Sequence, residues 1–346
     1  MLRNLLWGSL FLAPATIAVD KLTGAGDVAL FVLAACALIP LAWLIGESTE
    51  HAAEHTGPGI GGFLNASFGN APELIVALFA VGANLPVVVR GSLSGSVISN
   101  LLLVYGVSQV AGPDGARIDR RSLLVQIGLV AAAVVAFAVP VGFGYAGPPE
   151  RHTVVVASVP VAIVLLLLYL GVVGRNLRRH QRREREEPRA GAWPLSTALF
   201  ALAAATAATA WVSEILVHSL HAFASAVGLS EFFIAVVIVA IVGNAAEHGG
   251  AILIARSGKM RLATEIAISS SAQVALLVVP VVLLLSLLFT HPLGLAFRWS
   301  ELVAMAGAAV LVAVTVWDGR SHRREGALLI AAYAAAVLGF LLGGGR

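Results

Sequence analysis

The chain has 346 residues, of which 59% are apolar and only 12% are charged, and its mean hydropathy is +0.92. A soluble domain carries about 25% charged residues, so roughly half of the usual water-facing charge is missing. The net charge of +3 is too small to indicate a nucleic-acid-binding face, and the single cysteine, Cys36, excludes an intramolecular disulfide. We therefore expect an integral membrane protein whose partner is the lipid bilayer and not nucleic acid.

Eleven apolar stretches are long enough to cross a bilayer, which takes about 20 residues in a helix. In chain order they are 4–19, 27–46, 61–82, 85–111, 121–141, 152–174, 193–218, 230–255, 262–289, 299–317 and 326–343. Runs such as 161–170 and 276–288 lack the alternation of a barrel strand, so an all-α membrane fold with about eleven transmembrane helices is predicted. The first stretch, preceded by Arg3, could instead be a signal peptide.

The basic residues predict an orientation. With the N-terminus in the cytoplasm and eleven crossings, 17 of the 22 Lys and Arg residues fall in cytoplasmic segments. A bias of this size follows the positive-inside rule, and one miscounted helix would scramble it. We expect a multi-pass protein of a bacterial-type cell inner membrane, with the N-terminus in the cytoplasm and the C-terminus outside.

A motif occurs twice. GNAPE at 69–73 coincides with GNAAE at 243–247 when the chain is shifted by 174 residues. Under this shift Asn100 faces Val274, and a one-residue gap is needed to pair it with Gln273. Five predicted crossings separate the two motifs, so the copies run through the membrane in opposite directions. Such inverted repeats place a shared site near the bilayer midplane.

The polar segment 175–192, which holds seven arginines, divides the chain into the two similar halves. Its composition is typical of a solvated linker. The predicted organisation is an N-terminal transmembrane helix (1–22), a first five-helix repeat (23–174), a cytoplasmic linker (175–192) and a second five-helix repeat (193–346).

Each motif ends in a glutamate, Glu73 or Glu247, within an apolar span. A carboxylate in hydrocarbon is costly, so each is a functional candidate, although a protonated glutamate hydrogen-bonded to a neighbouring helix would also be stable. The nearby sequence supplies oxygen donors, namely Asn70, Asn244, Ser96, Ser99, Asn100, Ser269, Ser270, Ser271 and Gln273. Carboxylate, amide and hydroxyl oxygens suit hard cations such as Ca²⁺. No cofactor is predicted.

Proton coupling is expected from the same two glutamates. Burial favours the protonated form of a carboxyl group, whereas a bound cation favours the ionised form. Glu73 and Glu247 would then hold either protons or one divalent cation, and this competition, with alternating access, is sufficient for antiport. His248 follows the second motif and could relay protons, or it could be a packed, hydrogen-bonding residue.

The segment 51–55 spells H-x-x-E-H, the zinc signature of inverted zincins, which makes an intramembrane metalloprotease an alternative. Glu47 and Glu50 precede it and Gly57-Pro58-Gly59 follow it. These neighbours favour a hydrated acidic cluster at the cytoplasmic end of the second span, where it would attract cations.

Five stretches, at 46–55, 61–80, 91–106, 232–248 and 265–281, resemble the calcium/cation antiporter superfamily, and specifically its cation/proton exchanger branch. The resemblance implies a calcium/proton antiporter and not an enzyme, built from one N-terminal helix and two inverted sets of five. It also implies that Glu73 and Glu247 carry Ca²⁺ and H⁺, with Asn70, Asn244, Ser96, Asn100 and Gln273 as ligand or pathway groups. Exchange of Na⁺, K⁺ or another divalent cation stays open, as does the oligomeric state.

Overall fold

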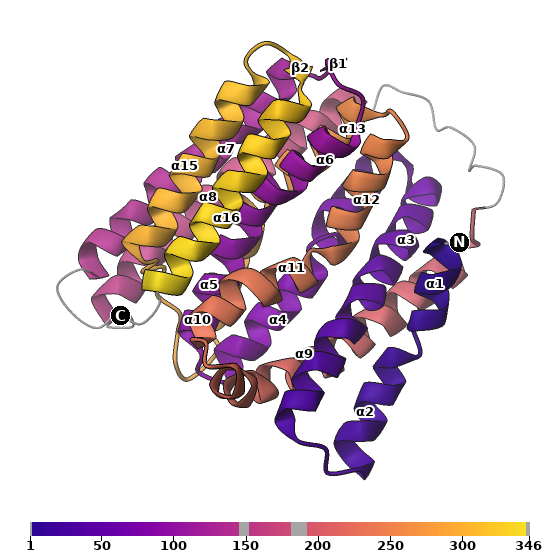
Figure 1. The fold of residues 1–346 in the computed structure, drawn as a ribbon, viewed down its shortest axis with the longest axis vertical. Coiled ribbons are helices and arrows are strands. Elements are labelled where there is room, and N and C mark those ends of the chain that lie inside the picture. The colour runs from indigo at the N-terminus through magenta and orange to yellow at the C-terminus, as the bar shows by residue number, and fades with distance from the viewer. Residues whose placement is uncertain (1, 145–151, 181–191, 344–346) are drawn as a thin grey trace.

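The computed structural model describes residues 2–144, 152–180 and 192–343, which form a bundle of helices (Figure 1). Residues 181–191 of the predicted linker lie outside the described part. In chain order the helices are α1 (Leu2–Ser9), α2 (Leu12–Leu22), α3 (Asp27–Phe68), α4 (Ala71–Gly82), α5 (Pro86–Ile98), α6 (Tyr105–Ala111), α7 (Arg120–Gly144), α8 (His152–His180), α9 (Leu195–Val227), α10 (Glu231–Phe233), α11 (Ala240–Gly243), α12 (Ala245–Arg256), α13 (Met260–Gln273), α14 (Val279–Ser286), α15 (Trp299–Val316) and α16 (Arg323–Gly343).

Three π-helical segments interrupt these helices, namely η1 (Ser99–Val104), η2 (Ile234–Val239) and η3 (Val274–Val278). Two short strands, β1 (Ala116–Arg117) and β2 (Arg320–Ser321), pair antiparallel in the loops before α7 and α16. The two strands belong to opposite halves of the chain, so they connect the halves at one end of the bundle.

The all-α membrane fold is confirmed. Within the described ranges nine helices are long and apolar enough to span a membrane, and ten if the bent pair Glu231–Gly243 and Ala245–Arg256 counts as one span. The predicted boundary between the spans 27–46 and 61–82 is wrong, because α3 continues from Asp27 to Phe68. Glu47, Glu50 and Glu54, with Ala52 and Ala53, favour helix in the first part of the polar stretch between them. The helix then continues through Gly57-Pro58-Gly59 against the preference of these residues.

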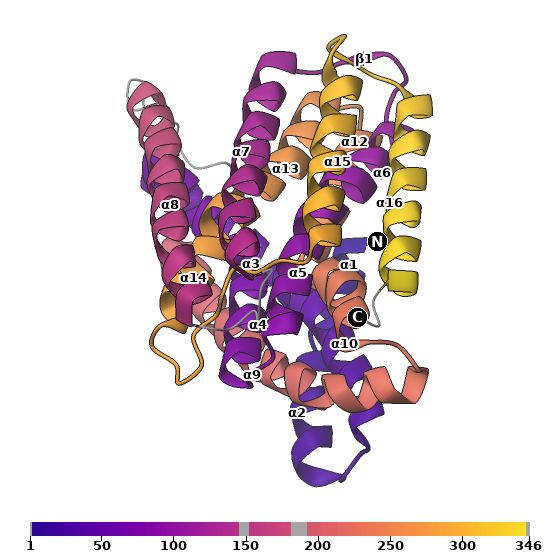
Figure 2. The ribbon, with the colours of Figure 1, turned by 90° about the vertical axis from the view of Figure 1, so that its left-hand side faces the viewer.

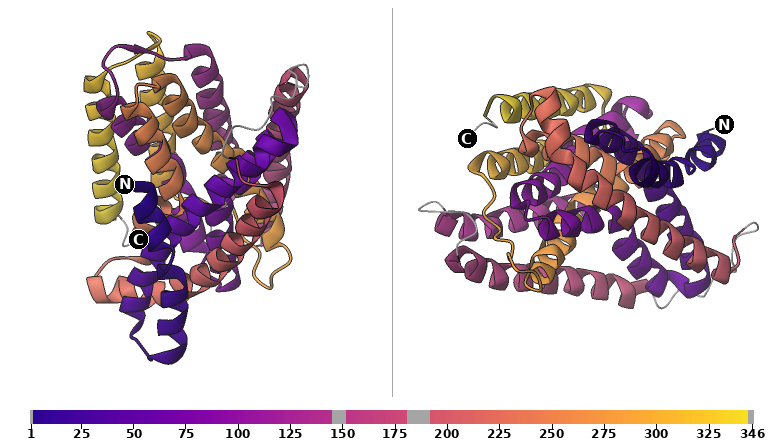
Figure 3. Two further views of the ribbon diagram at one scale, coloured as in Figure 1. Left: turned by 90° about the vertical axis from the view of Figure 1, so that its right-hand side faces the viewer. Right: turned by 90° about the horizontal axis from the view of Figure 1, so that it is seen from below.

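The longest helices, α3 and α9, pack along each other and cross the molecule obliquely (Figure 3). Helices α7, α15 and α16 stand together on another side (Figure 2). Between these groups lie α4, α5, α12 and α13, which carry the two motifs and the segments that follow them. The interrupted helices are therefore surrounded by protein, the only setting in which irregular backbone is tolerated at membrane depth.

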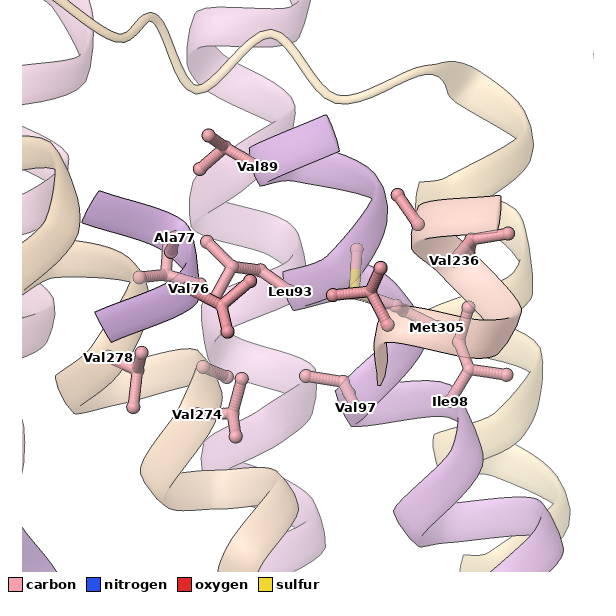
Figure 4. Close-up of a cluster of buried hydrophobic side chains, with 14 of the residues drawn as sticks. Val76, Ala77, Val89, Leu93, Val97, Ile98, Val236, Val274, Val278 and Met305 are labelled. Atoms are coloured by element: carbon pink, nitrogen blue, oxygen red, sulfur yellow. The ribbon is translucent and has the colours of Figure 1, made fainter. Parts of the chain in front are cut away.

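The centre of the bundle is packed by aliphatic side chains from both halves (Figure 4). Val76 of α4 and Leu93 of α5 lie beside Val274 of η3 in this cluster. Gly95 of α5 faces the backbone carbonyl of Val236 in η2, where an added methyl group would overlap that carbonyl. Small residues that let backbones touch are the usual means of helix packing in membranes. The two halves thus meet through backbone as well as side chains.

A candidate cation site between the two halves

Two breaks in helices position the motif glutamates. Gly69 and Asn70 separate α3 from α4, and Asn244 separates α11 from α12 at the bent pair, whose angle is 59°. The two asparagines have nearly the same non-helical backbone, with φ/ψ of −98°/16° at Asn70 and −93°/7° at Asn244. Glu73 and Glu247 are consequently each the third residue of a helix. The unpaired N–H groups and the helix dipole favour negative charge there.

Glu73 is buried in a small cavity of about 10 Å³, which has room for roughly one water molecule. The cavity is lined by Glu73, Val76, Ser92, Leu93, Ser96, Val239 and Gly243. Both carboxyl oxygens of Glu73 are buried and accept no hydrogen bond from the described residues. A methyl group on Gly243 would lie 3.3 Å from Cγ of Glu73. The glycine of the second motif therefore makes room for the glutamate of the first.

Glu247 is partly exposed as a residue, but Oε2 of its carboxyl group is buried and accepts no hydrogen bond from the described residues. The same carboxyl group interacts with the hydroxyl of Ser270. The carboxyl groups of Glu73 and Glu247 lie close enough to interact electrostatically. Neither forms an ion pair with a basic side chain within the described part of the chain. Two neighbouring carboxylates without a basic partner are strongly unfavourable inside a membrane, so protons or a cation must neutralise them.

Amide side chains join the halves in two equivalent pairs. Nδ2 of Asn70 donates to Oε1 of Gln273 (2.7 Å), and Nδ2 of Asn100 donates to Oδ1 of Asn244 (3.2 Å). In each pair the motif asparagine of one half meets an amide from the other half. Asn100 and Gln273 are therefore counterparts, as the one-residue gap in the sequence comparison required. The one-residue offset coincides with the π-helical segments, each of which holds an inserted residue. Under the 174-residue shift, η3 begins one residue later than η1 does.

Ser96 and Ser270, which are equivalent under the 174-residue shift, connect these amides to the glutamates. Nδ2 of Asn244 donates to Oγ of Ser96 (2.8 Å), and Nδ2 of Asn100 donates to Oγ of Ser270 (2.9 Å). Each hydroxyl accepts one hydrogen bond and can donate its own proton elsewhere. Ser270 interacts with Glu247, while Ser96 lines the cavity beside Glu73.

His248 extends this network. Its Nε2 lies 3.0 Å from Oδ1 of Asn100, and because an amide oxygen only accepts, Nε2 carries the proton and donates. A chain of polar contacts therefore runs from His248 through Asn100 and Ser270 to Glu247. Of the side chains that the sequence singled out, those that take part in these contacts or line the cavity are Glu73, Glu247, Asn70, Asn244, Ser96, Asn100, Ser270, Gln273 and His248.

Three other serines near the motifs do not face the glutamates. The hydroxyls of Ser99 and Ser269 donate to the carbonyl oxygens of Ser96 and Ile266, one turn earlier in the chain, a common arrangement for serine in membrane helices. The hydroxyl of Ser271 lies 3.4 Å from the carbonyl oxygens of both Ala267 in its own helix and Val97 in the other half. Composition alone could not separate these serines from Ser96 and Ser270.

Two polar groups were not singled out in the sequence. Ser92 lines the cavity of Glu73, and its spacing of four residues from Ser96 on α5 is the signal that could have found it. Glu301 is buried, and it accepts hydrogen bonds from Oγ of Ser94 (2.5 Å) and from the backbone N–H of Arg298 (2.6 Å). Glu301 therefore belongs to the cap of α15 and not to the site between the motifs.

The two histidines of the H-x-x-E-H segment contact Trp193 and are not arranged as the ligands of a metal ion. Nε2 of His55 lies 2.7 Å from the carbonyl oxygen of Trp193, whose backbone N–H donates to Nδ1 of His51 at 3.4 Å. The ring of His51 also stacks on Trp193, with centroids 4.5 Å apart. No group of three or more His, Cys, Asp and Glu residues in the described ranges is arranged to hold a metal. The geometry therefore favours attachment of α3 to the segment before α9 over a zinc centre.

Comparison with known proteins agrees with this arrangement. A profile of the sodium/calcium exchanger protein family matches residues 27–177 and 197–342. The chain belongs to this family. The Ca²⁺/H⁺ antiporter ChaA of Bacillus subtilis (strain 168) is 40% identical over 333 residues, which cover 90% of this chain and 92% of that protein. The Ca²⁺/H⁺ antiporter of Aphanothece halophytica is 34% identical over 343 residues, with 91% and 90% covered.

Solved structures of exchangers have the same fold. The structure of native YfkE matches with a TM-score of 0.82 and 37% identity, covering 95% of this chain and 97% of that one. The H⁺/Ca²⁺ exchanger CAX matches with a TM-score of 0.78 at 17% identity, covering 97% and 88%. The sodium-calcium exchanger NCX_Mj matches less well, with a TM-score of 0.59. The cation/proton exchanger branch predicted from the sequence is confirmed.

Proposed function

We propose that the chain is a calcium/proton antiporter that exports cytoplasmic Ca²⁺ in exchange for protons by alternating access. One observation carries the proposal: Glu73 packs against Gly243, four residues before Glu247, and interacts electrostatically with Glu247 inside the bundle, with no ion pair to a basic side chain among the described residues. One divalent cation or two protons would neutralise this pair equally well. The site can therefore hold either cargo but not both at once, which is the requirement for coupled exchange.

The donor set supports a hard cation. Carboxylate, amide and hydroxyl oxygens converge on the site, and Ca²⁺ accepts 6–8 such oxygens in adaptable geometry. We assign Glu73 and Glu247 as the carboxylate ligands. The neutral oxygen donors or pathway groups in this proposal are Asn70, Asn244, Ser96, Asn100, Ser270 and Gln273.

The relatives support the same cargo. Two of them, ChaA and the protein of Aphanothece halophytica, are named Ca²⁺/H⁺ antiporters, and each is matched over about nine tenths of its length. In this proposal the chain is a transporter and not an enzyme, and the only bound species in its cycle are the transported Ca²⁺ and H⁺.

Neutralisation of Glu73 and Glu247 tests the proposal. We expect Glu73→Gln and Glu247→Gln each to lower proton-driven ⁴⁵Ca²⁺ uptake into everted vesicles by more than about 100-fold, because one permanent loss of charge leaves Ca²⁺ half-balanced. Glu214→Gln is the matched control, since Glu214 is an exposed carboxylate on α9. Wild-type uptake by either site variant, at equal amounts of folded protein, would overturn the assignment.

Ion competition tests the selectivity for Ca²⁺, and an imposed membrane potential tests how many protons are exchanged for each Ca²⁺. We expect excess Na⁺ or K⁺ to leave ⁴⁵Ca²⁺ uptake unchanged, because each supplies only one charge to two carboxylates. If only these two carboxyl groups titrate, two protons exchange for one Ca²⁺ and an imposed potential has no effect. A potential-dependent rate would indicate a further proton.

The orientation is also a proposal. The distribution of Lys and Arg supports a cytoplasmic N-terminus and an external C-terminus in the cell inner membrane. A C-terminal alkaline phosphatase fusion should be active and a C-terminal GFP fusion dark. The opposite pair of results would reverse the topology and the direction of export.

A further inference from the structure

We propose that a groove between α7 and α8 binds one anionic glycerophospholipid, with its phosphate between Arg121 and Arg175. The groove is a cavity of about 640 Å³. Its lining residues are Asp119, Arg121, Ser122, Val125, Gln126, Leu129, Val172 and Arg175. In Figure 2 the two helices lie further apart at the end that carries the arginines. This lipid site is separate from the glutamates and does not depend on the proposed cargo.

The charge of the groove is available for a ligand. Arg121 and Arg175 are exposed and form no ion pair within the described part of the chain. The one carboxylate in the lining, Asp119, is already occupied, because it accepts from Nη2 of Arg261 at 2.6 Å and from the backbone N–H of Ser122 at 3.2 Å. The groove therefore presents a net positive field, and paired guanidinium groups are well suited to a phosphate.

The deeper part of the groove fits a lipid better than a free anion. Val125, Leu129 and Val172 provide an apolar wall below the arginines. Elsewhere on α7 and α8, Val135, Val139 and Leu167 are exposed, as expected for helices that contact lipid tails. A headgroup at the basic end and acyl chains along the apolar wall would cover both parts. Basic pockets between transmembrane helices are a known type of lipid headgroup site.

One polar atom in the lining, Oε1 of Gln126, indicates which headgroup chemistry the groove would bind. Oε1 of Gln126 is buried without a hydrogen-bond donor, while Nε2 of the same residue donates to Oγ of Ser122 at 3.3 Å. When the amide of Gln126 turns toward the groove, a headgroup hydroxyl that donates to this oxygen would satisfy it. Phosphatidylglycerol combines a phosphate with two such hydroxyls, so it is the class that the groove fits.

Thermal unfolding of the full chain in detergent tests the site with three probes: dioctanoyl-phosphatidylglycerol, dioctanoyl-phosphatidylcholine and inorganic phosphate. We expect the first to raise the melting temperature well above the effect of the other two. In the double variant Arg121→Gln/Arg175→Gln, the concentration for half of this effect should rise about thirtyfold. Arg256→Gln/Arg324→Gln is the matched control, since both of these arginines are exposed at the same basic end outside the groove.

Each outcome decides the matter. An equal response in the double variant and the control pair would overturn the site. A response to inorganic phosphate as large as that to phosphatidylglycerol, lost in the double variant, would make the groove an anion site and overturn the lipid assignment. Should the double variant not fold, Val125→Trp keeps both arginines. Its added fluorescence should be quenched more by bromine-labelled phosphatidylglycerol than by bromine-labelled phosphatidylcholine, and equal quenching would contradict the proposal.

Discussion

Glu73 in the first half and Glu247 in the second half hold the same place in their motifs but have different neighbours. Both carboxyl oxygens of Glu73 are buried beside Gly243 without a hydrogen-bond partner among the described residues, whereas only Oε2 of Glu247 is, and its carboxyl group interacts with Ser270. The position that follows each motif also differs, because His248 occupies the place that Leu74 has in the first half. The repeat therefore supplies two equivalent backbones, while the surrounding helices make the two carboxyl groups unequal. We expect the enclosed one to depend more strictly on geometry.

Among variants that keep the carboxyl charge, the largest effect should come from shortening each glutamate by one methylene. In Glu73→Asp the carboxyl group withdraws from a cavity with no room to adjust, and a displacement of about 1 Å can cost 100-fold in rate. Glu247→Asp should lose only about tenfold, because Glu247 is a partly exposed residue and the hydroxyl of Ser270 can turn to follow a small displacement of its carboxyl group. The check is ⁴⁵Ca²⁺ uptake in proteoliposomes, and equal losses would show that the two environments are equivalent in function.

The next effect concerns the backbone contact between the halves. Gly95→Ala would place a methyl group against the carbonyl of Val236, so either α5 or η2 must shift. We expect a loss of about 1–3 kcal/mol in unfolding free energy, seen as a lower melting temperature in detergent. Ser269, the counterpart of Gly95 under the 174-residue shift, already carries a side chain, so Ser269→Ala is the control and should change little. An unchanged melting temperature in Gly95→Ala would contradict the close contact.

Replacing His248 by leucine, the residue at the equivalent position of the first half (Leu74), tests the difference in the position that follows each motif. His248→Leu removes the hydrogen bond to Oδ1 of Asn100 and leaves that oxygen unsatisfied. We expect a loss of about tenfold in transport rate, as for one hydrogen bond, with the pH profile retained. A loss of more than about 100-fold in proton-coupled exchange, with Ca²⁺ binding intact, would instead identify His248 as a proton relay.

The smallest effect is expected where the halves meet outside the membrane. The backbone N–H of Arg323 donates to Oδ1 of Asp114 at 2.8 Å and lowers the pKa of this carboxyl group. A carboxyl group with a lower pKa in the folded state stabilises that state above its unfolded pKa, and this contribution is lost as the pH falls through the folded pKa. Asp114→Asn should therefore lower the melting temperature slightly at neutral pH and not in acid. A difference that persists in acid would point to lost packing.

Much of the site could be predicted from the sequence because its signal is local. A glutamate in an apolar span is conspicuous, and two copies at a constant shift indicate one shared site. The sequence could not show which serines contact the site and which bond to their own helix. Ser96 and Ser99 lie three residues apart on consecutive turns, yet one accepts from Asn244 and the other donates to its own helix. That choice depends on which neighbour reaches each hydroxyl, and a linear pattern carries no such distance.

The sequence by itself determined that this protein lies in a membrane, that it is helical, and that two glutamates in repeated motifs are its chemical centre. These properties follow from the cost of exposing charge and backbone to lipid, which constrains every stretch of residues locally. Only the tertiary structure decided that α3 continues through its polar stretch, that Asn70 meets Gln273 and Asn100 meets Asn244, and that Glu73 is the enclosed carboxyl. These features depend on close packing between segments far apart in the chain, where differences of a few ångströms select the partner.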